Sequence, residues 1–593
     1  MTIGLRCHHW MAIAISLWLS AAHPQSLPAD EPEKEAVLAA REVLRRHCVR
    51  CHSGEGSEGG NFNVLDVHSL RENGLLDEDA PDESVLLSRV VDGEMPPASI
   101  RSQQPVSQEE VEQLRRWLHA GASGFDIELS RTKVTIQSVM QAMLADLQSM
   151  PRDQRQFIRY FTLHHLHNSR SILTRDLPIV RAALAKSLNS LSWHPQIVLP
   201  REIPLAGTSA IAEGLLYAID IRLLRWDTAI WRKIEMAYPY GVSYASSEHE
   251  SLQMAAETLD ELTSAGVPMV RADWFVATAT RGDLYYEILD LPTNEKDLLE
   301  QLDVDAESAF KDPHIDLIAR AGFSKSGVSA QNRLVERLVG KSGMYWRSFD
   351  FGPDAGRGKL TRFPLGPQSS TSQFNRHAFT HDGGEIIFAL PNGLHAYLLI
   401  DGNGDRIDVG PIHVVGDALK TAGTPAIVNA VSCFACHKHG MIDVADTLRE
   451  GSILEGDALR HLRKLHPTRD AMDQVVQRDR QAYLVQLEKV IGRYLRVGQD
   501  KDKGVEQFDE PIGHVARQHR LVFLDLDTVA AELDVSPDEL MRVAGSRNIR
   551  RLGLESLTRD GVISRAEWEA KDQGISLMQQ LARVLRLTPV SAL

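Results

Sequence analysis

Cysteine is scarce in this chain, since only five of its 593 residues are cysteine, too few for a fold built on disulfides. Long apolar runs are also missing, which argues against a membrane-spanning protein. Positive charge is in deficit as well: 65 Lys and Arg residues face 80 Asp and Glu residues, a net charge of -15. Nucleic-acid binding, which needs a basic face, is therefore not expected. The composition is that of a soluble globular protein, and the length favours three or four domains.

The first 26 residues have the features of a secretory signal peptide. Arg6, His8 and His9 precede an apolar run from Trp10 to Leu19, and small residues follow it. The alternative is a membrane anchor, but this run is shorter than the roughly 20 residues that cross a bilayer. We therefore predict an exported, periplasmic or otherwise extracytoplasmic protein without a membrane span after cleavage, in which Cys7 is removed with the signal.

The four remaining cysteines fall into two Cys-x-x-Cys-His motifs. The first motif is Cys48-Val49-Arg50-Cys51-His52, and the second motif is Cys433-Phe434-Ala435-Cys436-His437. A disulfide, a thioredoxin-like redox pair or a Cys₄ zinc site would account for the cysteines, but none of them accounts for a histidine after both pairs. Two thiols at this spacing can each bond one vinyl group of a haem, and the following histidine can bind the iron. The motifs predict two covalently attached haem c groups, with His52 and His437 as proximal ligands.

The sequence around the first motif predicts a small helical haem domain. Val37, Ala40 and Leu44 share one face of a helix that leads into Cys48. A Gly-rich stretch, Ser53 to Gly60, follows the motif, and Asp92 to Pro97 places Met95 in an irregular, proline-containing segment. There a thioether can bind the open face of the haem. The final helix has a capping box, formed by Ser107 and Glu110, before apolar residues at helical spacing: Val111, Leu114, Trp117 and Leu118.

These features, in this order, resemble the planctomycete-type cytochrome c domain over residues 34 to 124. In that family the methionine before the paired prolines is the distal iron ligand, so the resemblance implies that role for Met95. Aromatic-rich segments further along, such as Tyr345 to Asp350, are similar to those of large planctomycete-type c-type cytochromes. The resemblance extends to the second motif and implies no known reaction for the region between.

We expect a multidomain α+β protein. The predicted parts are the signal peptide (1–26), a mainly α cytochrome c-like domain (34–124), a mixed α/β region of unknown role (125–354), a small β-containing second haem region (355–450) and a helical C-terminus (451–593). In the mixed region His164, His165 and His167 fall in one helical stretch, where buried or surface roles are more common than metal binding.

The second motif offers no clear distal ligand. Upstream of it, two β-rich runs around Asn392-Gly393 predict a hairpin, so this haem is expected to lie against a small sheet. Met441 is only four residues after His437 and would share a helix face with it, so it is an unfavourable choice. Four histidines are then candidates, namely His381, His395, His413 and His439. We favour His381, and an open sixth position is an equal alternative.

Three functions fit this pattern. The first is a dihaem electron-transfer protein that serves a redox partner protein of unknown identity. The second is a peroxidase-like dihaem oxidoreductase with an open second haem, and the third is a haem-based sensor. No catalytic residue of the chain itself is predicted, because the iron carries out the electron chemistry.

Overall fold

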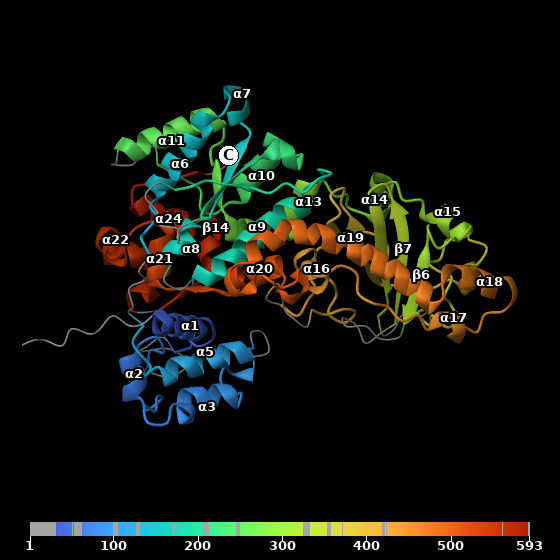
Figure 1. The fold of residues 1–593 in the computed structure, drawn as a ribbon, viewed down its shortest axis with the longest axis horizontal. Helices are drawn as coiled ribbons and strands as arrows, with labels where there is room; N and C mark the ends of the chain where they lie inside the picture. Colours follow the sequence, from blue (N-terminus) through green and yellow to red (C-terminus); the bar gives the residue numbers. More distant parts are fainter. Residues whose placement is uncertain are drawn as a thin grey trace, which may run out of the picture.

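The computed structural model describes residues 31–49, 51–52, 62–98, 105–125, 131–169, 172, 174–205, 213–244, 250–323, 332–352, 357–369, 372–417, 422, 424–559 and 561–590. The predicted signal peptide lies outside these residues. The chain is a mixed α+β protein, as expected, in which helices predominate. It has two parts with separate apolar cores: the helical unit (residues 31–125) and the main body (residues 131–590) (Figure 1).

The helical unit is built on two helices that pack against each other, α1 (Glu31–His47) and α5 (Gln108–His119). The predicted faces are confirmed, because Val37, Ala40 and Leu44 of α1 and Leu114 and Trp117 of α5 are fully buried. The predicted capping box of α5 is also present. The shorter elements are α2 (Val67–Glu72), the 3₁₀ turn η1 (Pro81–Glu83) and α3 (Val85–Val91).

The first half of the main body surrounds a four-stranded sheet of order β2-β3-β1-β5. Its strands are β1 (Ile158–Thr162), β2 (Arg201–Glu202), β3 (Leu216–Asp220) and β5 (Met269–Arg271). The helices are α6 (Ile136–Ser149), α7 (Arg152–Arg155), α8 (His164–Asn168), α9 (Leu177–Ser190), α10 (Thr228–Ala237), α11 (Glu250–Thr263), α12 (Ala272–Ala279) and α13 (Gly282–Leu289).

A six-stranded antiparallel sheet forms the other end of the main body (Figure 1). In spatial order its strands are β11 (Arg406–Ile407), β10 (His395–Asp401), β9 (Gly383–Ala389), β8 (Gly343–Asp350), β7 (Arg333–Gly340) and β6 (Ala319–Phe323). The predicted hairpin is confirmed, because β9 and β10 pair across Asn392-Gly393, where Gly393 has a φ of +81°. Nearby helices are α14 (Glu295–Leu302), α15 (Ala306–Lys311), α17 (Leu448–Gly451) and α18 (Gly456–Leu465).

The C-terminal part is mainly helical and joins the two halves of the main body. Its long helix α19 (Arg469–Leu495) packs on α9 and runs toward the six-stranded sheet (Figure 1). The other helices are α16 (Val431–Cys436), α20 (Pro511–Leu521), α21 (Leu526–Glu532), α22 (Pro537–Arg551), α23 (Arg565–Glu569) and α24 (Leu577–Val584). Short strand pairs join β12 (Phe523–Leu524) to β13 (Ile563–Ser564), β14 (Lys571–Asp572) to β15 (Ile575–Ser576), and β16 (Thr588–Pro589) to β4 (Val242–Ser243).

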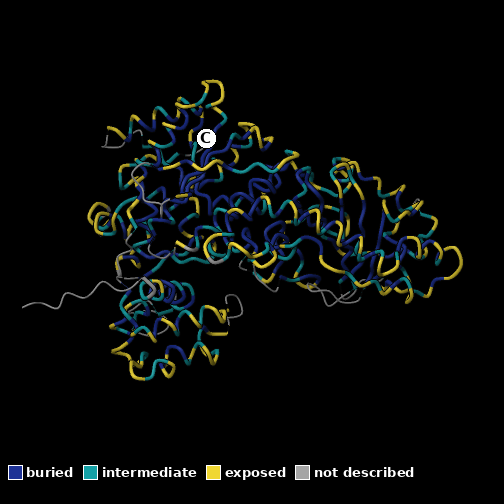
Figure 2. Tube along the Cα trace, viewed as in Figure 1, coloured by how far each residue is buried: buried dark blue, intermediate teal, exposed yellow. Residues whose placement is uncertain are grey.

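One apolar core runs through the whole main body, from Val134 to Ala582. The buried residues form its interior along the full length in Figure 2. This core draws on all three regions that the sequence suggests after residue 125, whereas the helical unit keeps its own core. The boundaries predicted at 354 and 450 stay predictions.

Candidate haem-attachment sites

The first motif directly follows α1 and forms a tight turn. The N–H groups of Cys51 and His52 both donate to the carbonyl of Cys48, at 3.1 and 3.0 Å. Val49 is fully buried in the core of the helical unit, and Cys48, Cys51 and His52 are half-buried. The imidazole of His52 stacks on the ring of Phe62, with ring centroids 4.5 Å apart. The turn thus holds two thiols and one imidazole together. Arg50 and Ser53 to Gly60 lie outside the described residues.

Glu110 of α5 contacts the last turn of α1, directly before the first motif. Its carboxylate accepts from Arg46 at 2.7 Å and lies 3.1 Å from Nε2 of His47, and it also accepts from the N–H of Ser107. Burial opposes ionisation of Glu110, but the hydrogen bond from His47 and the charge of Arg46 prevail and lower its pKa to about 2. The last turn of α1 is therefore fixed immediately before Cys48.

Met95 lies in the segment after α3 and is half-buried. Its N–H donates to the carbonyl of Arg89 at 2.9 Å, so the segment folds back on the helix. The role of Met95 as second ligand to the first haem stays a prediction.

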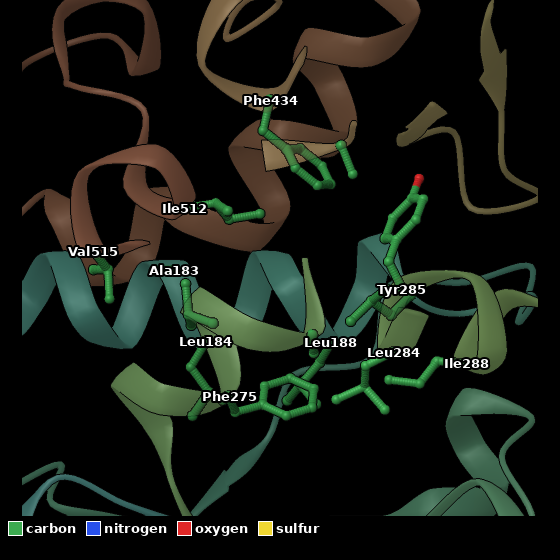
Figure 3. Packing of buried hydrophobic residues seen from close by; sticks show 14 of the residues in the cluster. Ala183, Leu184, Leu188, Phe275, Leu284, Tyr285, Ile288, Phe434, Ile512 and Val515 are labelled. Atoms are coloured by element: carbon green, nitrogen blue, oxygen red, sulfur yellow. The ribbon is translucent and has the colours of Figure 1, made fainter. Parts of the chain in front are cut away.

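The second motif begins inside a helix, since Cys433 and Cys436 belong to α16 and His437 ends it. The N–H of His437 donates to the carbonyl of Cys433 at 2.8 Å, the same bond that His52 makes to Cys48. Phe434 corresponds to Val49 in the first motif and is equally buried. It packs in the main core close to α9 and α20 (Figure 3).

The imidazole of His437 has a defined orientation. Its Nδ1 donates to the carbonyl oxygen of Gly440 at 3.3 Å, and its Nε2 lies 3.7 Å from Oε2 of Glu385. A backbone carbonyl on Nδ1 is the usual device that leaves Nε2 for a metal. Burial opposes ionisation of Glu385, but its interaction with the nearby His437 and the charge of Arg333 lower its pKa to about 2.

A cavity of about 590 Å³ borders the second motif. Cys433, Cys436 and His437 line it on one side, and one face of the six-stranded sheet lines it on the other. Its volume is within the usual range of ligand pockets, about 300 to 1,000 Å³. The cavity lies between the motif and the sheet, where the sequence analysis sets the second haem. The sheet contributes Arg333, Val335, Trp346, Ser348, Glu385 and Ile387.

Burial raises the pKa of Cys48 and of Cys436 to about 12, and it raises the pKa of Cys433 well above its ordinary value. The four described cysteines form no disulfide, and the described residues contain no group of three or more His, Cys, Asp or Glu placed to hold a metal ion.

The predicted distal ligand His381 does not line this cavity. Its ring instead packs edge-on against Phe349 and Phe379, with centroids 5.0 and 6.1 Å away. Burial among aromatic rings accounts for its position, and the cavity gives His381 no support as a ligand. The other candidate histidines are also outside the lining: His395, His413 and His439.

Met441 does line the cavity, but it is not on one helix with His437 as expected. The helix α16 ends at Cys436, and Gly440 turns the chain with a φ of +91°. The expectation that Met441 shares a helix face with His437 is therefore wrong, and that argument against Met441 as a distal ligand no longer holds.

The two motifs approach each other across a second cavity, also about 590 Å³, between the helical unit and the main body. Arg46 and His47, just before the first motif, line one wall, and Ala435 and Lys438 of the second motif and its flank line another. Close by, Arg41 forms an ion pair with Asp525 at 2.8 Å, and Arg45 donates to the carbonyl of Phe523. Sequence alone gave no indication of this contact.

The sequence did not point to Glu385, whose carboxylate lies 3.7 Å from Nε2 of His437. One signal was present: Glu385 is the single charged residue in an otherwise apolar strand, Gly383–Ala389. The three clustered histidines, by contrast, are buried and hydrogen-bonded within the fold, for example His165 to Asp273 at 2.9 Å.

Comparison with protein-family models, curated proteins and solved structures gave no match to this chain. Within the described residues, no helix has both the length and the apolar character needed to cross a membrane.

Proposed function

We propose that the chain is an exported dihaem c-type cytochrome that transfers electrons to or from a redox partner protein, similar to large planctomycete-type cytochromes. The observation that carries the proposal is the shared local geometry of the two motifs. In each, a buried residue follows the first cysteine, and the histidine N–H is bonded to the carbonyl of that cysteine. Both motifs thereby hold two thiols and an imidazole in one turn.

The residues around the second motif fit a haem. Cys433 and Cys436 would bond its vinyl groups, and Nε2 of His437 is left for the iron by the bond from Nδ1 to Gly440. Cys48, Cys51 and His52 would hold the first haem, with Met95 as its second ligand. A bound haem supplies one-electron chemistry at its iron. The polypeptide would orient the group.

A second candidate function is a peroxidase-like dihaem oxidoreductase with an open second haem. One observation favours it: of the described histidines, only His437 lines the cavity at the second motif. The prediction of a second imidazole ligand therefore has no structural support there.

Haem content tests the proposal. Holoprotein purified from an exporting host should contain two covalently bound haems by intact mass and by the pyridine haemochrome spectrum. The double variants C48A/C51A and C433A/C436A should each retain one haem. Two variants with unchanged haem content, or a wild-type chain with fewer than two haems, would contradict it.

A further inference from the structure

The space in front of His437 Nε2 is occupied by a carboxylate. Oε2 of Glu385 is 3.7 Å from Nε2, and the carboxylate lies on the sheet side of the cavity that both thiols border. Metal bonds of imidazole nitrogen and of carboxylate oxygen are each about 2 Å long for first-row metals such as zinc. A separation of 3.7 Å is therefore close to the distance between two ligands of one metal ion.

The fold holds Glu385 in this place. Glu385 lies in the middle of the six-stranded sheet. Its backbone N–H donates to Oγ of Ser348 at 2.9 Å, which fixes the backbone at this position. Arg333, on the same wall of the cavity, is itself fixed by an ion pair with Asp350. The backbone of Glu385 and the positive charge near its carboxylate are thus both set by the sheet.

Two other lining side chains have atoms that could bind a metal, Met441 and Asp443, but a contact with Nε2 of His437 is recorded for Glu385. Asp443 is paired instead with Arg480 at 2.9 Å. His381 packs against phenylalanine rings outside the lining. His395 is buried against Tyr483, with ring centroids 4.1 Å apart, and is also outside the lining.

We infer that Glu385, and not a second histidine, faces the sixth coordination position of the second haem. This inference rests on the proposed function, because it needs a haem on Cys433 and Cys436. A carboxylate is a weaker ligand to haem iron than an imidazole or a thioether. The site should therefore admit small exogenous ligands, such as carbon monoxide on ferrous iron and cyanide on ferric iron.

The test uses full-length holoprotein with its haem content measured first. Carbon monoxide should bind to one of the two haems per chain, and the ferric protein should lack the EPR signal of a bis-imidazole haem. The variant E385Q keeps the side-chain shape and removes the charge. We expect it to change cyanide affinity by about tenfold and to shift the C–O stretching frequency. The variant H381A is the matched control and should leave both unchanged.

Two results would overturn the inference. A bis-imidazole signal with no carbon monoxide binding would assign a histidine to the sixth position. Loss of that signal in H381A or in H395A would identify the histidine. Carbon monoxide binding that E385Q leaves unaltered would remove Glu385 from the site. A haem content below two per chain would instead be a failure of the proposed function.

Discussion

The Cys-x-x-Cys-His motif occurs in two different structural environments in this protein. In the helical unit, the first motif is held by neighbours within about one domain of sequence, chiefly α1 and α5. In the main body, Phe434 of the second motif lies beside Lys186, which is 248 residues earlier in the chain and is paired with Glu510. The comparison teaches that a local motif predicts its own geometry, whereas the far side of the site depends on long-range packing.

The buried residue after the first cysteine shows the difference most clearly. Val49 packs among aliphatic residues of a small core. Phe434 packs in the main core, and the ammonium of Lys186 lies 5.7 Å from the centre of its ring. Lys186 is in turn paired with Glu510 at 2.7 Å. A buried charged pair therefore lies beside Phe434, whereas Val49 packs in an apolar cluster.

The largest effect should come from breaking this buried ion pair. K186M leaves Glu510 buried without its partner, and we expect a loss of about 3 to 5 kcal/mol in the stability of the main body. Thermal unfolding of the holoprotein, followed by circular dichroism and by the two haem spectra, measures it. The control is K133M, because Lys133 is about half exposed in its pair with Asp534 and should cost no more than about 1 kcal/mol. Equal effects of the two variants would mean that burial does not set the contribution of the Lys186–Glu510 pair.

A smaller effect is expected where the helical unit meets the main body. R41M removes the mostly buried partner of Asp525. We expect the free energy of association between the helical unit and the main body to become less favourable by about 2 kcal/mol. The helical unit should keep its haem spectrum, since its core is separate. Faster proteolytic separation of the two parts, with that spectrum unchanged, would support this. R115M, which breaks an exposed pair on the same unit, is the control and should not change the cleavage rate.

The smallest effect concerns pH and should be confined to the main body. His519 lies between Asp273 and Glu569, at 3.1 and 2.7 Å. Burial lowers the pKa of His519, but the two carboxylates outweigh it and raise the pKa above its ordinary value of about 6.5. The stability from its charge is complete below about pH 6.5 and is lost as pH rises through the folded pKa.

H519Q should therefore destabilise the main body more at about pH 6 than at about pH 9, with a difference on the order of 1 kcal/mol. Thermal unfolding at the two pH values measures this. H119Q, which alters an exposed pair of the helical unit, is the control, because such pairs contribute little to stability. If H519Q lost the same stability at both pH values, the imidazole of His519 would be neutral in the folded protein.

Much of the local structure could be predicted from the sequence. The buried faces of α1 and α5, the capping box at Ser107 and the hairpin around Gly393 all depend on residues within a few turns or one strand pair. The distal side of the second motif could not be predicted in this way. His381 is the ligand that the sequence favours, but its ring packs edge-on against Phe349 and Phe379 and does not line the cavity.

By itself, the sequence determined the two Cys-x-x-Cys-His turns, because their geometry depends on hydrogen bonds between residues three or four positions apart. Only the tertiary structure decided that Glu385 faces His437 and that Arg41 meets Asp525. The physical reason is that these partners come from strands and helices brought together by burial of shared apolar faces. Residue spacing reports which face of an element is buried, but it does not report which distant element covers that face.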